Sequence, residues 1–222
     1  MQDQTAELEW RDGQVPVSTR FDDPYFSLED GLAETRHVFL DGNDLPARFR
    51  EGFHVAELGF GTGLNLLATW AAWRVSGTQG ALRYTSFEAF PMALYDMETA
   101  LAAFPELGEL PAALLSAMRA GGTEHDLGDV HLTLIVGDAR RTLPTWGGQA
   151  DAWFLDGFSP AKNPELWNAD LMAEVAAHTA PGGTAATYTA AGFVRRGLEA
   201  AGFAVTRIPG YGRKRHMTQA RL

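Results

Sequence analysis

Apolar and polar positions alternate along residues 53–208 in a pattern that predicts strands and helices in turn. Short apolar runs of strand length are followed by segments whose apolar residues recur at helical spacing. The expected strands cover 54–58, 82–87, 130–136, 150–155 and 184–189, and the expected helices cover 64–75, 91–104, 107–120, 169–179 and 191–201. Strands that alternate with helices predict an α/β fold whose parallel sheet is covered on both faces.

Both ends of the chain depart from this alternation. Residues 203–208 and 216–222 are strand-like but too close together for a crossover helix, so we expect an antiparallel hairpin. A mostly parallel sheet that ends in an antiparallel pair is typical of the Rossmann-like class I methyltransferase fold. Residues 1–50 show no long helical period. We expect them to form a small N-terminal extension, with a short strand at 37–40, before one domain of residues 51–222.

The composition excludes several kinds of site. The chain has no cysteine, so disulfides, thiolate metal sites and cysteine nucleophiles are excluded. Its six histidines are scattered without ligand spacing, so no metal is expected. The first residues are polar, and no apolar run reaches the length of about 18 that a membrane helix needs. We therefore expect no signal peptide, no membrane span and a cytoplasmic location.

Charge is distributed unevenly along the chain. The net charge of −10 argues against a general nucleic-acid binder. Residues 193–222, however, carry seven cations and a single acid, Glu199. This basic end either forms a solvated face or holds a polyanion. The candidates for phosphate contacts, together with Lys162 from an earlier loop, are Arg195, Arg196, Arg213, Lys214 and Arg215.

The glycine-rich loop 57–63, ELGFGTG, follows an expected strand and opens an expected helix. Its glycines allow a tight turn and close approach to a ligand. The spacing GxGxG differs from the GxGxxG fingerprint of dinucleotide sites. The acid Glu57 suits a cationic ammonium group, which S-adenosylmethionine has and NAD lacks. We therefore expect S-adenosylmethionine here, with an ordinary strand-to-helix turn as the alternative. The candidate cofactor-binding residues are Glu57, Gly59, Phe60, Gly61, Thr62, Gly63 and Asn65.

Further acids follow the next strands, at the edge of the sheet where ligands bind in open α/β folds. Glu88 ends the second expected strand, near the offset at which acids accept hydrogen bonds from ribose hydroxyls. Asp138, which is followed by Ala139, ends the third expected strand. We expect this pair to contact the adenine of the cofactor, with Asp138 as a helix cap being the alternative.

The proline-rich loop 156–164 begins with Asp156 at the end of the fourth expected strand. This position faces the place where the methyl group of the cofactor should lie, so we expect Asp156 to contact the cofactor and to act in catalysis. Isolated aromatic residues more often belong to a core than to a binding site. The candidate substrate-binding residues are nevertheless Tyr25, Phe26, Phe158, Lys162 and Asn163.

Several segments together resemble a known family. They are AELGFGTGLNLL (56–67), AWFLDGFSPAKNPELW (152–167), PGGTAATYTAAGFVRRGLEAAGF (181–203) and GYGRKRHM (210–217). These segments, and residues 16–43, look like the methyltransferase domain of the bifunctional tRNA 5-methylaminomethyl-2-thiouridine biosynthesis proteins. The resemblance implies N-methylation of the 5-aminomethyl group of (2-thio)uridine at the wobble position, in the tRNA anticodon loop. Because the sequence ends soon after these segments, we expect a stand-alone form without the FAD-dependent oxidase domain.

The implied reaction assigns roles to the candidate residues. Asp156 would accept a hydrogen bond from the attacking amine and stabilise the ammonium that develops. The aromatic candidates would stack on the uracil ring or flank the sulfonium, and the basic candidates would hold tRNA phosphates in a salt-sensitive way. A separate oxidase or other wobble-uridine enzymes would supply the aminomethyl group. The alternatives are a small-molecule or protein amine as acceptor, a nicotinamide oxidoreductase and a non-catalytic binding module.

Overall fold

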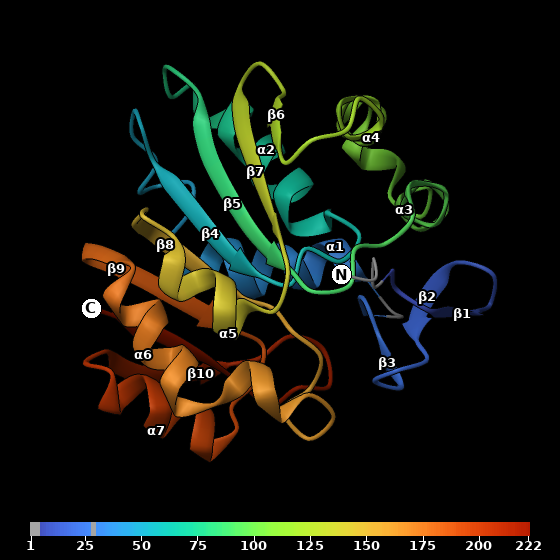
Figure 1. Cartoon of the computed structure of the whole chain (residues 1–222). Helices are drawn as coiled ribbons and strands as arrows, with labels where there is room; N and C mark the ends of the chain where they lie inside the picture. Colours follow the sequence, from blue (N-terminus) through green and yellow to red (C-terminus); the bar gives the residue numbers. More distant parts are fainter. Residues whose placement is uncertain (1–4, 28–29) are drawn as a thin grey trace.

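The computed structural model describes residues 5–27 and 30–222, so residues 1–4 and 28–29 of the expected N-terminal extension lie outside it. In the described part, the central sheet has eight strands in the order β10-β11-β9-β8-β4-β5-β7-β6 (Figure 1). The inner strands, which pair in parallel, are β9 (Thr179–Thr187), β8 (Ala150–Leu155), β4 (His54–Leu58), β5 (Leu82–Glu88) and β7 (Val130–Val136). The predicted mostly parallel sheet is thereby confirmed.

Helices cover both faces of this sheet, and each face has its own hydrophobic core (Figure 1). One face is covered by α1 (Gly31–Thr35), α2 (Leu64–Ser76), α3 (Leu94–Leu101) and α4 (Leu110–Arg119). The other is covered by α5 (Ala139–Thr142), α6 (Ala169–Ala177) and α7 (Gly192–Ala200). Adjacent residues of one strand serve opposite faces, because Phe154 joins the first core and Trp153 the second. This two-layer cover explains why the strands read as continuous apolar runs.

The strands at both edges of the sheet pair antiparallel with their neighbours. The predicted C-terminal hairpin is confirmed: β10 (Ala204–Pro209) pairs with β11 (His216–Arg221), which in turn pairs with β9. At the opposite edge the short strand β6 (Glu124–Asp126) pairs with β7 and was not predicted. Strand β9 also begins earlier than expected. Its segment 181–183, which lies before the expected strand 184–189, forms a bulge, because the pairing with β8 skips between Ala150 and Ala152.

The expected strand at 37–40 is wrong. Residues Arg36–Leu40 form a π-helical turn, η1, that continues α1 and leads into the 3₁₀ turn η2 (Asp41–Asn43). Val38 and Phe39 are 0% and 3% exposed in the same core as α2, so a helical turn buries consecutive apolar residues that a strand would point to opposite faces. Residues 31–45 therefore pack with the main sheet, although they fall inside the expected extension 1–50.

Short elements complete the fold. Three antiparallel strands, β1 (Leu8–Arg11), β2 (Val15–Ser18) and β3 (Asp23–Pro24), form a small separate sheet beside the carboxyl ends of the main strands (Figure 1). The 3₁₀ turns outside the N-terminal region are η3 (Pro105–Leu107), η4 (Leu143–Thr145) and η5 (Pro164–Trp167). None of the described helices combines the length and the apolar character needed to cross a membrane.

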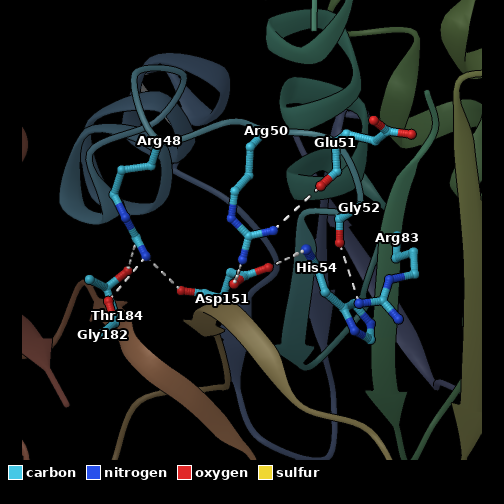
Figure 2. Close-up of polar contacts among 9 residues, drawn as sticks. All are labelled: Arg48, Arg50, Glu51, Gly52, His54, Arg83, Asp151, Gly182 and Thr184. Atoms are coloured by element: carbon cyan, nitrogen blue, oxygen red, sulfur yellow. Dashed lines mark hydrogen bonds and ion pairs between the residues drawn. The ribbon is translucent and has the colours of Figure 1, made fainter. Parts of the chain in front are cut away.

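A polar network ties the amino ends of the inner strands together, at the opposite edge from the candidate site (Figure 2). Asp151 on β8 accepts a hydrogen bond from Arg50 Nη2 at 2.6 Å through Oδ1 and one from the His54 backbone N–H at 2.9 Å through Oδ2. Arg48 Nη2 donates to the Asp151 backbone oxygen at 3.0 Å and to the Gly182 oxygen at 3.3 Å. The network holds residues 48–54, which lead into β4, against β8 and β9.

Replacing Asp151 by alanine should therefore destabilise the protein without touching the candidate site. The change leaves the buried His54 N–H without its acceptor and removes the Arg50 ion pair, with an expected loss of about 2–3 kcal/mol. That corresponds to a melting temperature lower by roughly 5–10 °C for a chain of this size. The control is Arg119→Ala, which breaks a surface ion pair with Glu98. Equal melting temperatures for the two variants would contradict this role of Asp151.

Candidate active site

A large cavity opens at the carboxyl ends of β4, β5, β7 and β8. Its volume is about 1490 Å³, and its wall combines the loop after β4 with residues from the N-terminal sheet, from α1 and from the β10–β11 loop. The segments that follow four parallel strands thus meet at one edge of the sheet, as expected for an open α/β fold. The cavity brings together most of the candidate residues.

The glycine loop after β4 lies against the catalytic candidate. Gly59, Gly61 and Gly63 have φ angles of +92°, +52° and +80°, a region that suits glycine. A Cβ on Gly59 would lie 2.0 Å from the backbone oxygen of Asp156, and one on Gly61 would lie 3.1 Å from the ring of Tyr25. The glycines therefore allow the loop to run directly beneath the β8 terminus and the aromatic lining.

Glu88 at the end of β5 supports this loop. Its Oε2 accepts a hydrogen bond from the Gly61 N–H at 2.9 Å, and its Oε1 accepts one from the Phe90 N–H at 2.8 Å. Burial raises the pKa of Glu88, against the effect of these backbone donors. A carboxylate has about four lone-pair sites, so two acceptor positions are left. Glu88 lines the cavity and can still accept from a vicinal diol there.

Asp138 has the capping role that the sequence left as its alternative. Its Oδ1 accepts from the Arg140 N–H at 3.0 Å and so caps α5, and the Arg140 guanidinium also binds both carboxylate oxygens. The Arg140 hydrogen bond lowers the pKa of Asp138. Asp138 and Ala139 both line the cavity, so the placement fits the expected adenine region, but the carboxylate already has strong partners.

Asn65 on α2 joins two acids, Glu57 on β4 and Asp156 after β8. Its Nδ2 donates to Glu57 Oε1 at 2.9 Å and to Asp156 Oδ2 at 2.7 Å, while its Oδ1 accepts from the Thr35 hydroxyl at 2.9 Å. Glu57 also accepts from the Ser86 hydroxyl at 2.7 Å. Every polar atom of the Asn65 amide is therefore used, and the amide fixes the orientation of the Asp156 carboxyl.

Glu57 lies below the cavity rather than in its wall. It is 0% exposed and does not line the cavity in the described structure. The direct contact with a ligand ammonium group expected from the sequence is therefore absent from this arrangement of the described residues, and Glu57 instead anchors Asn65. The sequence offered no sign of this role, because it depends on how α2 packs back over β4 beyond the glycine loop.

The two bridged acids have unusual acidities. Burial raises the pKa of Glu57 to about 8, although Ser86 and Asn65 donate to it. Burial also raises the pKa of Asp156 to about 7; the Asn65 hydrogen bond and the Lys214 charge oppose this shift, and Glu34 adds to it. At neutral pH Glu57 therefore keeps its proton, whereas Asp156 exchanges its proton readily. An acid of this kind is suited to accept a proton near pH 7.

Aromatic rings line the cavity beside Asp156. Phe158 stacks on Phe21 with ring centroids 4.7 Å apart, and Tyr25 meets Phe158 edge-on at 5.0 Å. Burial raises the pKa of Tyr25, so its hydroxyl remains protonated. Phe26 packs against Phe104 at 5.0 Å and belongs partly to the core. Phe158 and Tyr25 thus line the cavity, where the sequence predicts substrate contacts, and Phe26 lines it while also packing against the core.

Residues Asp22 and Asp23 of the N-terminal sheet hold the loop after β8. Asp23 Oδ2 accepts from the Ser159 N–H at 2.7 Å, and Lys162 Nζ pairs with Asp22 Oδ2 at 3.2 Å and Asp23 Oδ1 at 3.6 Å. Lys162 and Asn163 line the cavity as expected. The lysine predicted to contact phosphate is, in this structure, paired with two acids of its own chain.

The basic candidates divide into two groups. Arg213 and Lys214, in the β10–β11 loop, line the cavity. Arg195, Arg196 and Arg215 do not belong to its wall in the described residues. Lys214 Nζ pairs with Glu34 Oε1 at 2.6 Å. Of the basic candidates, all among the described residues, only Lys162, Arg213 and Lys214 line the cavity, and the other cations in its wall, Arg20, Arg140 and Arg141, were not predicted.

Sequence reasoning missed several contributors to the cavity wall, among them one acid, one hydroxyl and one phenol. Glu34 and Thr35 come from α1, which was expected to lie in an irregular extension, and Tyr188 follows β9. The Tyr188 hydroxyl donates to the Gly157 oxygen at 2.7 Å, and burial raises the pKa of this phenol. Glu34 was findable as an acid that precedes the apolar run 38–40 by one helix turn. Tyr188 carried no local signal.

The cavity suits a nucleoside with a cationic centre. Acids in its wall include Glu34, Glu88 and Asp156, and Phe21, Tyr25 and Phe158 supply aromatic faces that attract a cation. The Glu88 carboxylate beside the glycine loop is placed for hydroxyl groups, and α5 begins at the adjoining strand end. These features fit the nucleoside and sulfonium of S-adenosylmethionine.

Comparisons with known proteins agree with this fit. A family model described as S-adenosyl-L-methionine-dependent methyltransferase matches residues 106–222, more than half of the chain. The tRNA 5-methylaminomethyl-2-thiouridine biosynthesis bifunctional protein MnmC of Caulobacter sp. (strain K31) is 50% identical over 234 residues, covering 99% of this chain and 39% of that protein. The protein of the same name from Stutzerimonas stutzeri (strain A1501) is 45% identical over 230 residues, covering 99% and 35%. The chain thus spans less than two fifths of these relatives.

A solved structure has the same fold along almost the whole chain. The crystal structure of MNMC2 from Aquifex Aeolicus superposes with a TM-score of 0.79 at 27% identity, covering 99% of this chain and 71% of that one. The glycopeptide N-methyltransferase MtfA complexed with sinefungin shares the fold alone, with a TM-score of 0.50 at 16% identity and coverage of 87% and 86%.

Proposed function

We propose, starting from the fact that this chain belongs to the S-adenosyl-L-methionine-dependent methyltransferases, that it methylates the aminomethyl nitrogen of a wobble uridine in tRNA. The observation that carries the proposal is an acid of raised pKa, Asp156, at the cavity floor beside aromatic rings and cations. The relatives named for 5-methylaminomethyl-2-thiouridine biosynthesis support the acceptor. The product would be 5-methylaminomethyl-2-thiouridine.

Residues at three places in the cavity would hold the three parts of the cofactor. Glu88 would bind the ribose, the region of Ala139 the adenine and loop 59–63 the methionine part. S-adenosylmethionine supplies, when bound, a methyl carbon on a cationic sulfur that leaves as a neutral thioether. The amine lone pair forms the new bond to that carbon while the carbon–sulfur electron pair passes to sulfur. The protein must align these atoms and receive one proton from the nitrogen.

The pKa of Asp156 decides whether it can take this proton. An alkyl ammonium has a pKa of about 10.4 and an ordinary Asp one of about 3.9, so transfer to such an Asp costs about 9 kcal/mol at about 1.36 kcal/mol per pKa unit. With the pKa of Asp156 at about 7, the cost falls to about 5 kcal/mol. Asp156 therefore combines the role expected from the sequence, aiming the amine lone pair, with that of proton acceptor.

The acceptor would enter with its base between the aromatic residues. A wobble base lies in a single-stranded loop and can be splayed out, so Phe158 and Tyr25 can stack on it without opening a duplex. Arg213 and its basic neighbours would hold the flanking phosphates. A tRNA acceptor also implies a cytoplasmic location and upstream enzymes that make the aminomethyl group, on this chain or on another.

The test is methyl transfer from labelled S-adenosylmethionine to synthetic anticodon stem-loops. One RNA carries 5-aminomethyluridine at the wobble position, a second carries 5-aminomethyl-2-thiouridine and a third carries uridine. We expect label in the first two and none in the third, and nucleoside mass spectrometry should place the methyl group on the side-chain nitrogen. Label in free amines or in proteins but in none of these RNAs would refute the tRNA assignment while leaving the methyltransferase family intact.

A further inference from the structure

An ion pair between Lys214 and Glu34 lies in the same cavity wall as Asp156. Lys214 Nζ lies 2.6 Å from Glu34 Oε1, and the Glu34 side chain is only 14% exposed. The same ammonium lies 4.2 Å from the centre of the Tyr188 ring. A primary ammonium group is therefore held between a carboxylate and an aromatic face, which is a favourable environment for any alkyl ammonium.

This arrangement belongs to the catalytic cavity. Glu34, Tyr188, Lys214 and Asp156 all line it. Thr35, the neighbour of Glu34 on α1, donates to Asn65, which in turn donates to Asp156, so α1 is tied to the catalytic carboxyl. The charges of Lys214 and Glu34 shift the pKa of Asp156 in opposite directions, which places both within electrostatic reach of it.

We infer that Glu34 and the face of Tyr188 form the subsite that receives the protonated aminomethyl group of the acceptor, and that Lys214 occupies this subsite in the free enzyme. The inference rests on the proposed function, because it takes an aminomethyl group as the acceptor. The lysine ammonium and the substrate ammonium have the same charge and donor number, so they compete for one carboxylate.

The subsite selects RNA over free amines because the displaced Lys214 needs a new partner. Lys214 lies in the β10–β11 loop between Arg213 and Arg215, so a phosphate bound there offers its ammonium a new partner. An RNA acceptor brings both groups: its phosphates draw Lys214 away and its ammonium takes the vacated Glu34. An amine without phosphate must displace Lys214 with no compensating contact. The pair therefore discriminates against free amines and nucleosides.

The test compares two acceptors on three variants and the wild type. The acceptors are the stem-loop with 5-aminomethyluridine and the free nucleoside 5-aminomethyluridine, which has no phosphate. Binding to enzyme loaded with S-adenosylhomocysteine is measured by calorimetry, and kcat and KM by methyl transfer. The variants are Lys214→Ala, Glu34→Gln and a control, Arg221→Ala. Arg221 also contributes one cation from the C-terminal hairpin, paired with Asp44 at 2.8 Å outside the cavity wall.

The inference predicts a crossed result. Lys214→Ala should bind the nucleoside about tenfold more tightly and the stem-loop about tenfold more weakly. Glu34→Gln should weaken both by about tenfold, in KM more than in kcat. Arg221→Ala should change neither ratio. If Lys214→Ala weakens both acceptors alike or leaves the nucleoside unchanged, Lys214 is only a tie between α1 and the loop. If the wild type methylates the stem-loop but Lys214→Ala does not affect the two acceptors in opposite directions, only this inference is refuted. If the wild type does not methylate the stem-loop at all, the proposed function itself is refuted.

Discussion

Replacing Asp156 by asparagine should lower kcat for methyl transfer by about 10²–10⁴-fold, the usual contribution of a positioned proton acceptor. Asparagine keeps the size of the side chain and can still accept from Asn65 Nδ2, which donates to Asp156 at 2.7 Å in the wild type. It cannot take a proton from the amine. Binding of S-adenosylhomocysteine should stay within a few-fold of wild type. Turnover close to wild type would refute the assignment of Asp156.

The pH profile separates a lost proton acceptor from a distorted site. In the wild type, kcat/KM should rise with pH and level off near the Asp156 pKa of about 7, because the ionised carboxylate and the ammonium acceptor are the reacting pair. In Asp156→Asn that inflection should disappear, and the small residual rate should rise until the free amine itself loses its proton. A variant that kept the inflection near pH 7 would show that another group titrates.

The same substitution should stabilise the protein at alkaline pH. The folded-state pKa of Asp156 is raised from 3.8 to about 7, so the unfolded chain releases this proton first and folding becomes less favourable between about pH 4 and pH 7. Asparagine removes this penalty, and Asp156→Asn should therefore melt at a higher temperature at pH 8 and at an equal temperature near pH 4. The raised pKa of Asp156, which the proposed reaction uses, thus lowers the stability of the fold above about pH 4.

The parts of the fold that the sequence predicts well are those with local signals. The apolar run His54–Leu58 and the helix from Leu64 have the boundaries expected or nearly so, because both are largely buried and bounded by glycines. Segment 37–40 misled, since its three consecutive apolar residues do not distinguish a buried strand from a buried helical turn. Packing of Val38–Leu40 into the core beside α2 favours the helical turn over a strand.

The candidate site shows the same division. Asp156, Glu88 and the glycine loop were placed correctly at the cavity because each follows a predicted strand. Contacts across the fold could not be predicted. Asn65, the cofactor-binding candidate, lines the cavity and also bridges Glu57 and Asp156, and Glu34 reaches the site because α1 packs beside α2. Lys214 was expected to be free for phosphate and is paired with Glu34. These roles depend on long-range packing, which the local pattern does not contain.

Substituting alanine for Gly59 should weaken cofactor binding, with the affinity for S-adenosylhomocysteine about 10–100-fold lower. The added Cβ would lie 2.0 Å from the Asp156 backbone oxygen, so the loop and the end of β8 must move apart. This displaces the backbone beneath the cofactor and the catalytic carboxyl at once. Methyl transfer should therefore be lost together with binding, unlike in Asp156→Asn, where only transfer is lost.

Two other glycines separate this overlap from the conformational cost of a side chain at positive φ. Gly77, at φ +70°, has nothing within 4 Å of an added Cβ, and Gly61, at φ +52°, would meet only the Tyr25 ring at 3.1 Å. Alanine at all three positions carries a similar backbone penalty of about 1 kcal/mol, but the steric overlap increases from Gly77 through Gly61 to Gly59. Affinity for S-adenosylhomocysteine should fall in that order, with Gly77→Ala equal to wild type, and circular dichroism should show the variants folded. Equal affinities for Gly59→Ala and Gly77→Ala would mean that the loop tolerates displacement and that contact between β4 and β8 does not shape the cofactor site.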